Sequence, residues 1–284
     1  MAKILLVANL NRDHIFYLSA PLVPNIRHQY QNQVFRLGGG GANTGAGLCR
    51  NGHQVSILTH VGNDATGDWL LQSTAALGIQ VDQVQRYQGA TPDVIIMLSP
   101  DGERTILSAC EPDLKIKIIP DFEKIDALYI NKKFNDAASW MREAVNKTCV
   151  FAQYQFETEQ PCHYLIASKK ELPTNLDDAW SFALSVAGRH LKAFIVTDAQ
   201  HGSIAYTQHH QHTQTIFATP TIVDTTGAGD TYCAGLIHHL MEKMSLEQAM
   251  LGAAYWASLS VQTKSSLPPP NLHTYHVKSN MPPT

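Results

Sequence analysis

The residues whose types and spacing most clearly suggest a chemical role form the run Val223–Thr231, which contains the letters DTTGAGD. An apolar run precedes it and Tyr232–Met244 follows with helical spacing, so these small residues are expected at a strand-to-helix turn. The first N–H groups of a helix have no partner within it, and with the helix dipole they bind anions. Gly227, Ala228 and Gly229 carry little side chain, so a phosphate group could come close to their backbone.

Asp230 lies directly beside this predicted anion site. A carboxylate in a first helical turn is favoured in its ionised form. Next to a transferring phosphoryl group, it would accept the proton of an attacking hydroxyl. The alternative is a tight turn in which Asp230 only caps the helix. The four letters GAGD fit that alternative well, whereas the full DTTGAGD run in this setting is more specific for phosphoryl transfer.

Length and composition bound the class of protein. The chain has 284 residues, of which 44% are hydrophobic and 16% charged, so a globular fold with a sizeable core is expected. The net charge of -3 offers no basic face for nucleic acid and no polybasic membrane patch. No apolar stretch approaches the roughly 18 residues of a membrane span. Five widely spaced cysteines without a CxxC favour a reducing compartment, so we expect a cytoplasmic protein.

Strand-like and helix-like runs alternate along the chain, which predicts a mainly parallel sheet flanked by helices. The expected strands are Ile4–Ala8, Val55–Thr59, Ala127–Ile130, Tyr164–Ala167 and Ala193–Thr197. Helices are expected from about Asn43 to Asn51, from Asp64 to Leu77, and from Ser245 to about Val261.

Two segments, 14–36 and 91–109, interrupt the alternation and are typical of antiparallel ribbon, with a turn at 100–102 in the second. They could form a small lid beside the main sheet, although periodicity alone favours ordinary edge hairpins. The His-rich tract 208–214 could bind a metal. We favour a solvated hairpin tip there, between strands 204–207 and 215–218, since nothing fixes those histidines in ligand geometry.

DTTGAGD resembles the C-terminal signature of the ribokinase-like (PfkB) family of carbohydrate and nucleoside kinases. Four further landmarks follow the family order over nearly the whole chain. They are Asn11 and Asp13, which resemble the early sugar-contacting pair; Leu37–Asn43 (LGGGGAN), which resembles the GGKGAN signature; Tyr164–Glu171, where the family has a strand and NxxE; and Thr197–Gly202, where it has a nucleotide loop.

The resemblance implies a single ribokinase-like α/β domain over 1–284, with a Rossmann-like sheet and a β-sheet lid made by 14–36 and 91–109. It implies transfer of a phosphoryl group from ATP, with Mg²⁺, to a primary hydroxyl of a small ribose- or fructose-like sugar. Many members also use a monovalent cation such as K⁺. Exposed ribbon edges need covering, so a homodimer through the lid is expected, without nucleic-acid or membrane partners.

The family's functional residues carry over to matching positions. Asp230 would be the base, and the N–H groups of Gly227, Ala228 and Gly229 would form the anion hole. The expected sugar contacts are Asn11, Asp13, Gly39, Gly40 and Asn43, since carboxylates and amides suit a polyol. The expected nucleotide contacts are Ser168, Glu171, Thr197, Gly202, Gly227 and Gly229, with Glu171 holding Mg²⁺ through water and Asp224 and Thr226 near a monovalent cation. Locally, Asn43 also fits a helix cap and Asp13 a surface turn.

Three positions depart from the family pattern. Ser168 replaces the Asn of NxxE, which is expected to weaken metal placement. Ala199 stands where the nucleotide loop usually has Gly. Gly40 replaces the Lys of GGKGAN, which removes a basic contact to the substrate. The proposed base and anion hole are unchanged.

The sequence does not decide which class of substrate is phosphorylated. A nucleoside would need apolar or aromatic lid contacts, for which Phe16, Tyr17 and Tyr30 are candidates. A phosphorylated or acidic sugar would need basic residues, and only Arg104 and Lys132 are available, each with a solvated surface position as its alternative. This scarcity favours a neutral sugar. A ligand sensor built on a kinase fold is the non-enzymatic alternative; Asp230 argues against it and Ser168 weakly for it.

Overall fold

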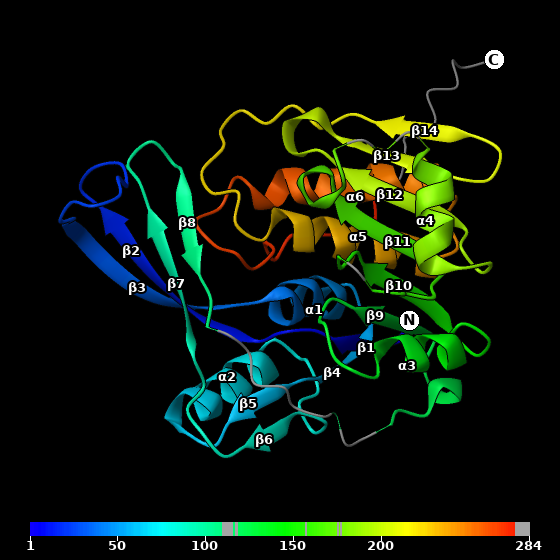
Figure 1. Cartoon of the computed structure of the whole chain (residues 1–284), viewed down its shortest axis with the longest axis horizontal. Coiled ribbons are helices and arrows are strands. Elements are labelled where there is room, and N and C mark those ends of the chain that lie inside the picture. Colours follow the sequence, from blue (N-terminus) through cyan, green and yellow to red (C-terminus); the bar gives the residue numbers. More distant parts are fainter. Residues whose placement is uncertain (110–115, 117–118, 157, 175, 177, 276–284) are drawn as a thin grey trace.

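A computed structural model describes residues 1–109, 116, 119–156, 158–174, 176 and 178–275 (Figure 1). Its centre is an eight-stranded sheet with the order β14-β13-β12-β11-β10-β9-β1-β4. The six parallel strands are β1 (Lys3–Val7), β4 (Gln54–Leu58), β9 (Ala127–Ile130), β10 (Cys149–Gln153), β11 (Tyr164–Ser168) and β12 (Ala193–Thr197). Antiparallel β13 (Ser203–Tyr206) and β14 (Gln211–Gln214) extend one edge. The predicted mainly parallel sheet is confirmed; β10 was not predicted.

Helices cover both faces of this sheet, which is why its strands are continuously apolar rather than alternating. One face packs against α1 (Gly40–Arg50), α5 (Ala228–Met241) and α6 (Leu246–Ser260). The other packs against α3 (Ala137–Ala144) and α4 (Ala179–Ala187). The remaining elements are α2 (Ala65–Ala76), the parallel pair β5 (His60–Gly62) and β6 (Gln85–Tyr87), and the one-turn helices η1 (Phe122–Lys124), η2 (Lys169–Glu171) and η3 (Ala199–His201).

Local capping signals begin three of the described α-helices, α2, α4 and α6. Asp64 caps α2 by accepting a hydrogen bond from the Gly67 N–H at 2.8 Å. Ser245 and Gln248 form the predicted capping box of α6. The helix expected from about Asn43 begins earlier, at Gly40, because Gly39 adopts a φ of +86° and turns the chain there.

The four remaining strands form a second sheet, with the order β3-β2-β7-β8. They are β2 (Asn11–Leu18), β3 (Tyr30–Gly38), β7 (Asp93–Leu98) and β8 (Arg104–Leu107). The pairs β2–β3 and β7–β8 are antiparallel, and β2 pairs with β7 in parallel. The two ribbons are therefore parts of one sheet rather than separate edge hairpins, and this sheet stands beside the main one in Figure 1. We call it the lid.

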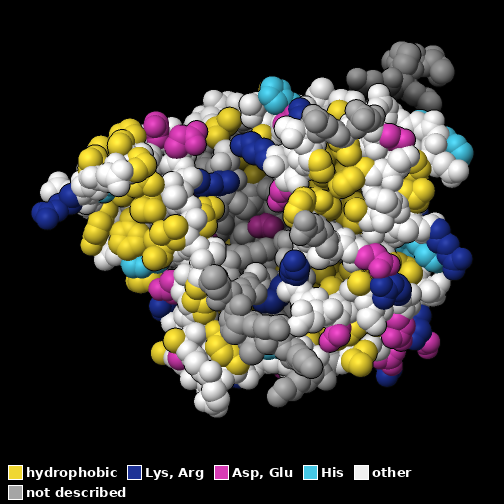
Figure 2. Space-filling view, viewed as in Figure 1, with side chains coloured by type: hydrophobic (Ala, Val, Ile, Leu, Met, Phe, Trp, Pro, Cys, Tyr) yellow, Lys and Arg dark blue, Asp and Glu magenta, His cyan; other side chains and the backbone are white. Residues whose placement is uncertain are grey.

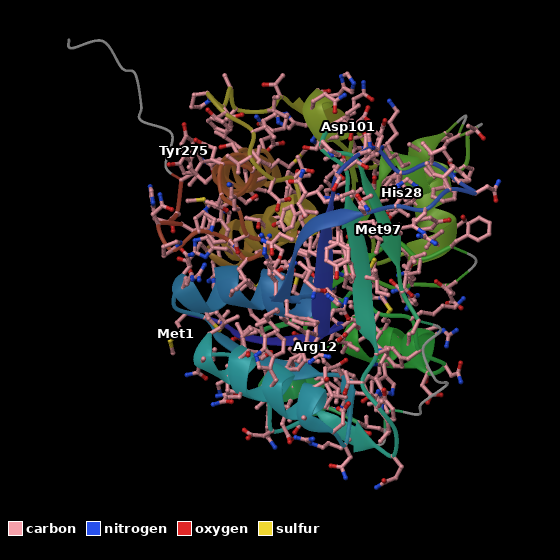
Figure 3. All side chains as sticks on the ribbon, turned by 90° about the vertical axis from the view of Figure 1, so that its left-hand side faces the viewer. Met1, Arg12, His28, Met97, Asp101 and Tyr275 are labelled. Atoms are coloured by element: carbon pink, nitrogen blue, oxygen red, sulfur yellow. The ribbon has the colours of Figure 1, made fainter. Side chains whose placement is uncertain are left out.

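Strand alternation gives the lid two different faces. The inner face, directed at the main domain, contains Asp13, Ile15, Tyr17, Val34, Arg36 and Leu98. The outer face contains His14, Phe16, Tyr30, Phe35, Ile95, Met97 and Leu107. Figure 3 looks onto the outer face, where Met97 is labelled. Phe16 and Tyr30 therefore point away from the cleft, and of the three aromatic residues considered for a nucleoside only Tyr17 lies on the inner face.

The His-rich tract is a hairpin, but its second strand differs from the prediction. β14 spans Gln211–Gln214 rather than 215–218. The turn is short because the Thr207 side chain closes it, with its hydroxyl donating to the His210 carbonyl and accepting from the His210 N–H. Among the described residues, no helix is long and apolar enough to cross a membrane, and Cys49, Cys149, Cys162 and Cys233 are free thiols. Cys110 lies outside the described residues.

Candidate active site

The two glycine-rich signatures, far apart in the sequence, meet at Asp230. Gly227 takes a left-handed φ of +76° and starts α5, which places Asp230 in its first turn. Asn43, in the first turn of α1, donates from Nδ2 to Asp230 Oδ2 at 2.8 Å. The neighbouring Thr44 hydroxyl donates to the Asp230 carbonyl at 3.3 Å. Because Gly39 is the residue before α1, Asn43 is not the cap of that helix; its side chain orients a carboxylate instead.

Burial sets the electrostatics of this pair. It raises the pKa of Asp230, and the hydrogen bond from Asn43 partly opposes the rise. The Asn43 Oδ1 atom is buried and has no hydrogen-bond partner among the described residues. An orphaned acceptor of this kind needs a donor, and a substrate hydroxyl is a suitable one.

The predicted anion hole lies immediately before Asp230. Within the described chain, no backbone acceptor pairs with the N–H groups of Gly227 and Gly229, and that of Ala228 makes a long bond of 3.3 Å to the Thr225 carbonyl. A Cβ added to Gly229 would meet no atom within 4 Å, so this side of the turn is open. A Cβ on Gly227 would overlap the Ser266 carbonyl. The turn thus offers weakly committed donors to an anion.

Asp13 is the second carboxylate of the cleft and lies on the inner lid face. It is only 5% exposed, so it is not the surface turn residue that the local sequence allowed. Burial and then repulsion from Asp230 raise the pKa of Asp13 to about 7, while Arg36, its partner across β2 and β3, lowers it. A Cβ on Gly38 would overlap the Asp13 carboxylate. Asn11 begins the same strand and is paired with Gly38.

Gly39 and Gly40 let the start of α1 touch two strand ends. A Cβ on Gly39 would overlap the Asn9 carbonyl just after β1. A Cβ on Gly40 would overlap the Asn131 side chain, which follows β9, and would come within 3.2 Å of Asp230 Oδ1. Sequence reasoning missed Asn131, although a polar residue directly after a buried parallel strand is a signal for a site at the carboxyl edge of the sheet.

Lys132 also belongs to this edge. Its Nζ donates to Asn9 Oδ1 at 2.7 Å, and the side chain is half-buried. The neighbouring Lys133 is exposed. Lys132 therefore contacts Asn9 at the carboxyl edge of the sheet, whereas Lys133 lies on the surface.

Ser168 ends β11, and Glu171 follows it at the end of the one-turn helix η2. Glu171 Oε2 accepts from the Ser168 N–H at 3.0 Å and from Gln153 Nε2 at 3.4 Å. The Ser in place of the family Asn thus opens the one-turn helix η2 and holds Glu171 through its backbone. Both bonds end on Oε2, so Oε1 is left for a hydrated Mg²⁺. Carboxylate oxygens are the ligands that this ion prefers.

The nucleotide-loop candidates follow β12. Thr197 ends that strand, and its hydroxyl donates to the Ala167 carbonyl at 3.3 Å. Ala199 has a φ of +46°, a left-handed conformation that costs a residue with a Cβ roughly 1 kcal/mol or more. This explains why glycine is usual there. Lys169 pairs with Asp198 at 2.6 Å and ties the loop to η2. Gly202 ends the loop with a φ of +88°.

Two lid arginines contact the loop that leads into the anion hole. Arg36 Nη1 lies 3.4 Å from Asp224 Oδ2, while Asp224 Oδ1 accepts from the Thr226 N–H at 2.9 Å. Arg104 Nη1 donates to the Thr226 hydroxyl at 3.0 Å and to that of Thr225 at 3.4 Å. Both Asp224 oxygens are engaged, and guanidinium groups border the residues considered for a monovalent cation. These residues fit a further cation poorly.

The sequence and the fold both have known counterparts. The profile of the pfkB carbohydrate kinase family matches residues 1–272. The fructosamine kinase of Bacillus subtilis strain 168 is 23% identical over 250 residues, covering 82% of this chain and 87% of the relative. The ribokinase of the same organism is 24% identical over 245 residues, with 79% and 80% covered. The structure of Arabidopsis thaliana ribokinase complexed with ribose and ATP has a TM-score of 0.77 at 21% identity, with 95% and 96% covered.

The raised pKa of Asp13 predicts that this residue destabilises the fold above neutral pH. The folded state keeps the Asp13 proton up to about pH 7, whereas the unfolded chain releases it near its ordinary value of 3.8. Stability therefore falls as the pH rises between these values, by up to about 1.4 kcal/mol per pH unit. We expect Asp13→Asn to raise the free energy of unfolding in urea at pH 8 and to change it much less at pH 4.

The exposed Asp82 provides the matched control. Asp82→Asn is expected to leave the free energy of unfolding within about 0.5 kcal/mol of the parent at both pH values. An Asp13→Asn effect of equal size at pH 4 and pH 8 would contradict the assigned shift.

Proposed function

The chain belongs to the pfkB family of carbohydrate kinases, and we propose that Asp230 is the base with which this ATP-dependent sugar kinase deprotonates a sugar hydroxyl. The observation that carries the proposal is the contact at 2.8 Å between Asp230 and Asn43, which joins the anion-hole turn to the second glycine signature. A hydroxyl bound at Asp230 would face a γ-phosphate bound at Gly227–Gly229.

The reaction is an in-line displacement. The hydroxyl oxygen bonds to the γ-phosphorus as its proton passes to the Asp230 carboxylate, and the bond to the β,γ-bridging oxygen breaks to release ADP. Burial raises the pKa of Asp230, which makes the carboxylate a stronger proton acceptor than a solvated one. The N–H groups of the turn would stabilise charge on the transferred group.

The sugar would lie between the lid and the carboxyl edge of the main sheet. Asn11, Asp13 and the backbone at Gly39 and Gly40 border this space, and the unpaired Asn43 Oδ1 would accept from a sugar hydroxyl. We propose that the reacting group is a primary hydroxyl, because the Asp230 carboxylate is half-buried and an unbranched carbon reaches it most easily.

ATP would enter along Ser168 and Thr197, the last residues of β11 and β12, and along Gly202, which directly precedes β13. Glu171 is the residue that would hold Mg²⁺ through water, with Ser168 and Gln153 orienting its carboxylate. Bound there, the ion would neutralise charge on the phosphates.

Replacing the base gives the direct test. We expect Asp230→Asn to lower kcat by about 10²- to 10⁴-fold, with little change in KM, because the amide cannot accept the proton. ADP release with ATP, Mg²⁺ and a panel of sugars measures this, with Asp82→Asn as the control. A folded Asp230→Asn protein with more than about a tenth of parental kcat would refute the assignment.

We further propose that the two lid arginines replace the monovalent cation that many relatives use. Arg36 beside Asp224 and Arg104 on Thr226 supply fixed positive charge next to the anion-hole turn. The rate of ADP release should then agree within about twofold in K⁺, Na⁺ and tetramethylammonium salts of equal ionic strength. A dependence on K⁺ of tenfold or more would count against this proposal.

A homodimer through the outer lid face is the partner we propose. Phe35, Tyr30 and Leu107 are each 52% exposed on that face, and hydrophobic side chains gather over the lid in Figure 2. His14 stacks on Phe35 with ring centroids 4.2 Å apart, so the patch is ordered before association. An exposed apolar sheet face of this kind is typical of an interface.

Light scattering at micromolar concentration tests the dimer. The parent is expected at twice the monomer mass, and Phe35→Asp is expected at the monomer mass because it would bury a charge in the interface. Gln208→Asp adds the same charge at the exposed β13–β14 turn and should leave the dimer intact. A monomeric parent would rule the proposal out.

A further inference from the structure

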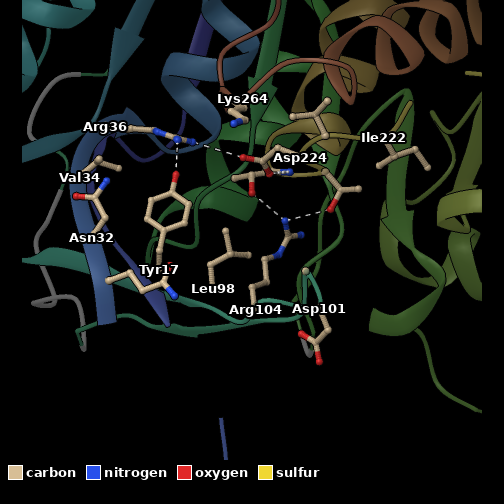
Figure 4. Close-up of a pocket in the computed structure, with 15 residues that line it drawn as sticks. Tyr17, Asn32, Val34, Arg36, Leu98, Asp101, Arg104, Ile222, Asp224 and Lys264 are labelled. Carbon is tan, nitrogen blue, oxygen red and sulfur yellow. Dashed lines mark hydrogen bonds and ion pairs between the residues drawn. The ribbon is translucent and has the colours of Figure 1, made fainter. Parts of the chain in front are cut away.

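A pocket of about 640 Å³ lies between the lid and the loop that leads into the anion hole. Figure 4 shows it, with the inner lid face on one side and Ile222–Thr226 on the other. Three basic side chains from three separate segments line it: Arg36 from β3, Arg104 from β8, and Lys264 from the segment after α6. We call it the lid-loop pocket.

The positive charge of the lid-loop pocket is only partly neutralised. Of the two acidic residues that line it, Asp224 is already bound by Arg36 and the Thr226 N–H. Asp101 accepts from the Glu103 N–H and points its carboxylate away from the pocket in Figure 4. Among the described residues, Arg104 donates to the hydroxyls of Thr225 and Thr226 and forms no ion pair, and Lys264 forms none either.

Hydrogen-bonding groups accompany these charges. The Tyr17 hydroxyl accepts from Arg36 Nη2 at 2.7 Å, which fixes the guanidinium with its remaining donors available. Asn32 lies beside Tyr17 on the same face. A pocket with two guanidinium groups, an ammonium, a phenol and an amide is chemically suited to a carboxylate or a phosphate.

The lid-loop pocket lies next to the proposed sugar cleft, although Asp13, Asn43 and Asp230 do not themselves line it. Arg36 is the register partner of Asp13, and Thr226 directly precedes the anion-hole turn. None of the nucleotide-side residues Ser168, Glu171 and Thr197 lines it. An occupant would therefore be the far end of a substrate whose hydroxyl lies at Asp230.

We propose that the sugar substrate carries an anionic group, a carboxylate or a phosphate, that binds in the lid-loop pocket to Arg36, Arg104 and Lys264. This inference rests on the proposed function and narrows its substrate class. It departs from the neutral sugar that the sequence favoured, because Arg36 and Lys264 were not recognisable as neighbours of Arg104 from their positions in the chain.

Matched substrates test the proposal by turnover. ADP release is measured with neutral D-fructose, with D-gluconate, and with D-fructose 1-phosphate. The parent should prefer one charged compound by at least about tenfold in kcat/KM. Arg104→Gln and Lys264→Gln should each lower the ratio of charged to neutral kcat/KM by about tenfold, mainly through KM. Arg27→Gln removes an exposed lid charge outside the pocket and should leave that ratio unchanged.

Binding without ATP gives a second readout. The charged compound that the pocket accepts should raise the Tm of the parent and of Arg27→Gln, and raise that of Arg104→Gln and Lys264→Gln much less. Comparing D-gluconate with D-fructose 1-phosphate identifies whether the pocket accepts a carboxylate or a phosphate. Turnover of D-fructose without preference for either charged compound would overturn the inference while leaving the sugar kinase intact.

The remaining outcomes also discriminate. Equal stabilisation of all variants would place the anion elsewhere, as at Gly227–Gly229, and would overturn the inference. Stabilisation that depends on Arg104 and Lys264, with Asp230→Asn as active as the parent, would support the lid-loop pocket while refuting the proposed base.

Discussion

The site depends on holding two carboxylates, Asp13 and Asp230, in one cleft. The ionised form of each carboxylate is disfavoured there, because burial raises the pKa of both, and repulsion from Asp230 raises the pKa of Asp13 further. The fold tolerates them through specific support: Asn43 donates to Asp230, and Arg36 is the register partner of Asp13. The backbone must also approach without side chains, which is why glycines occupy the joint between β3 and α1. A polyol whose hydroxyl groups donate hydrogen bonds to both carboxylates would stabilise their ionised forms.

Two arginines connect the lid to the loop that leads to Asp230, one through an ion pair and one through hydrogen bonds to hydroxyl groups. Arg36 and Arg104 reach from two lid strands to Asp224, Thr225 and Thr226, next to the turn that would bind the γ-phosphate. The same guanidinium groups line the lid-loop pocket. The lid and the loop before Asp230 are therefore joined through one cluster of charged and polar side chains, while the outer face of the lid is apolar and exposed.

Departures from the family pattern have local physical consequences. Ala199 has a left-handed conformation that glycine adopts freely, at some cost in strain. Ser168 lacks the amide of the usual Asn, yet its N–H still holds Glu171. Replacing Asn by Ser thus changes the side-chain donors near Glu171, while a backbone N–H contacts its carboxylate.

The sequence by itself determined the mainly parallel character of the main sheet, most of its strands and the capped start of α6, because these follow from short-range patterns of burial and capping. Ser245 with Gln248 and the buried run Ala127–Ile130 are examples. It did not predict β10, α3 or α4, and the strand expected before the turn at Asp230 is wrong, because residues 215–227 contain no strand. Only the tertiary structure decided that Arg36, Arg104 and Lys264 share one pocket. Their contacts join strands and loops more than a hundred residues apart, and which face of a lid strand each side chain uses depends on register, which no local pattern specifies.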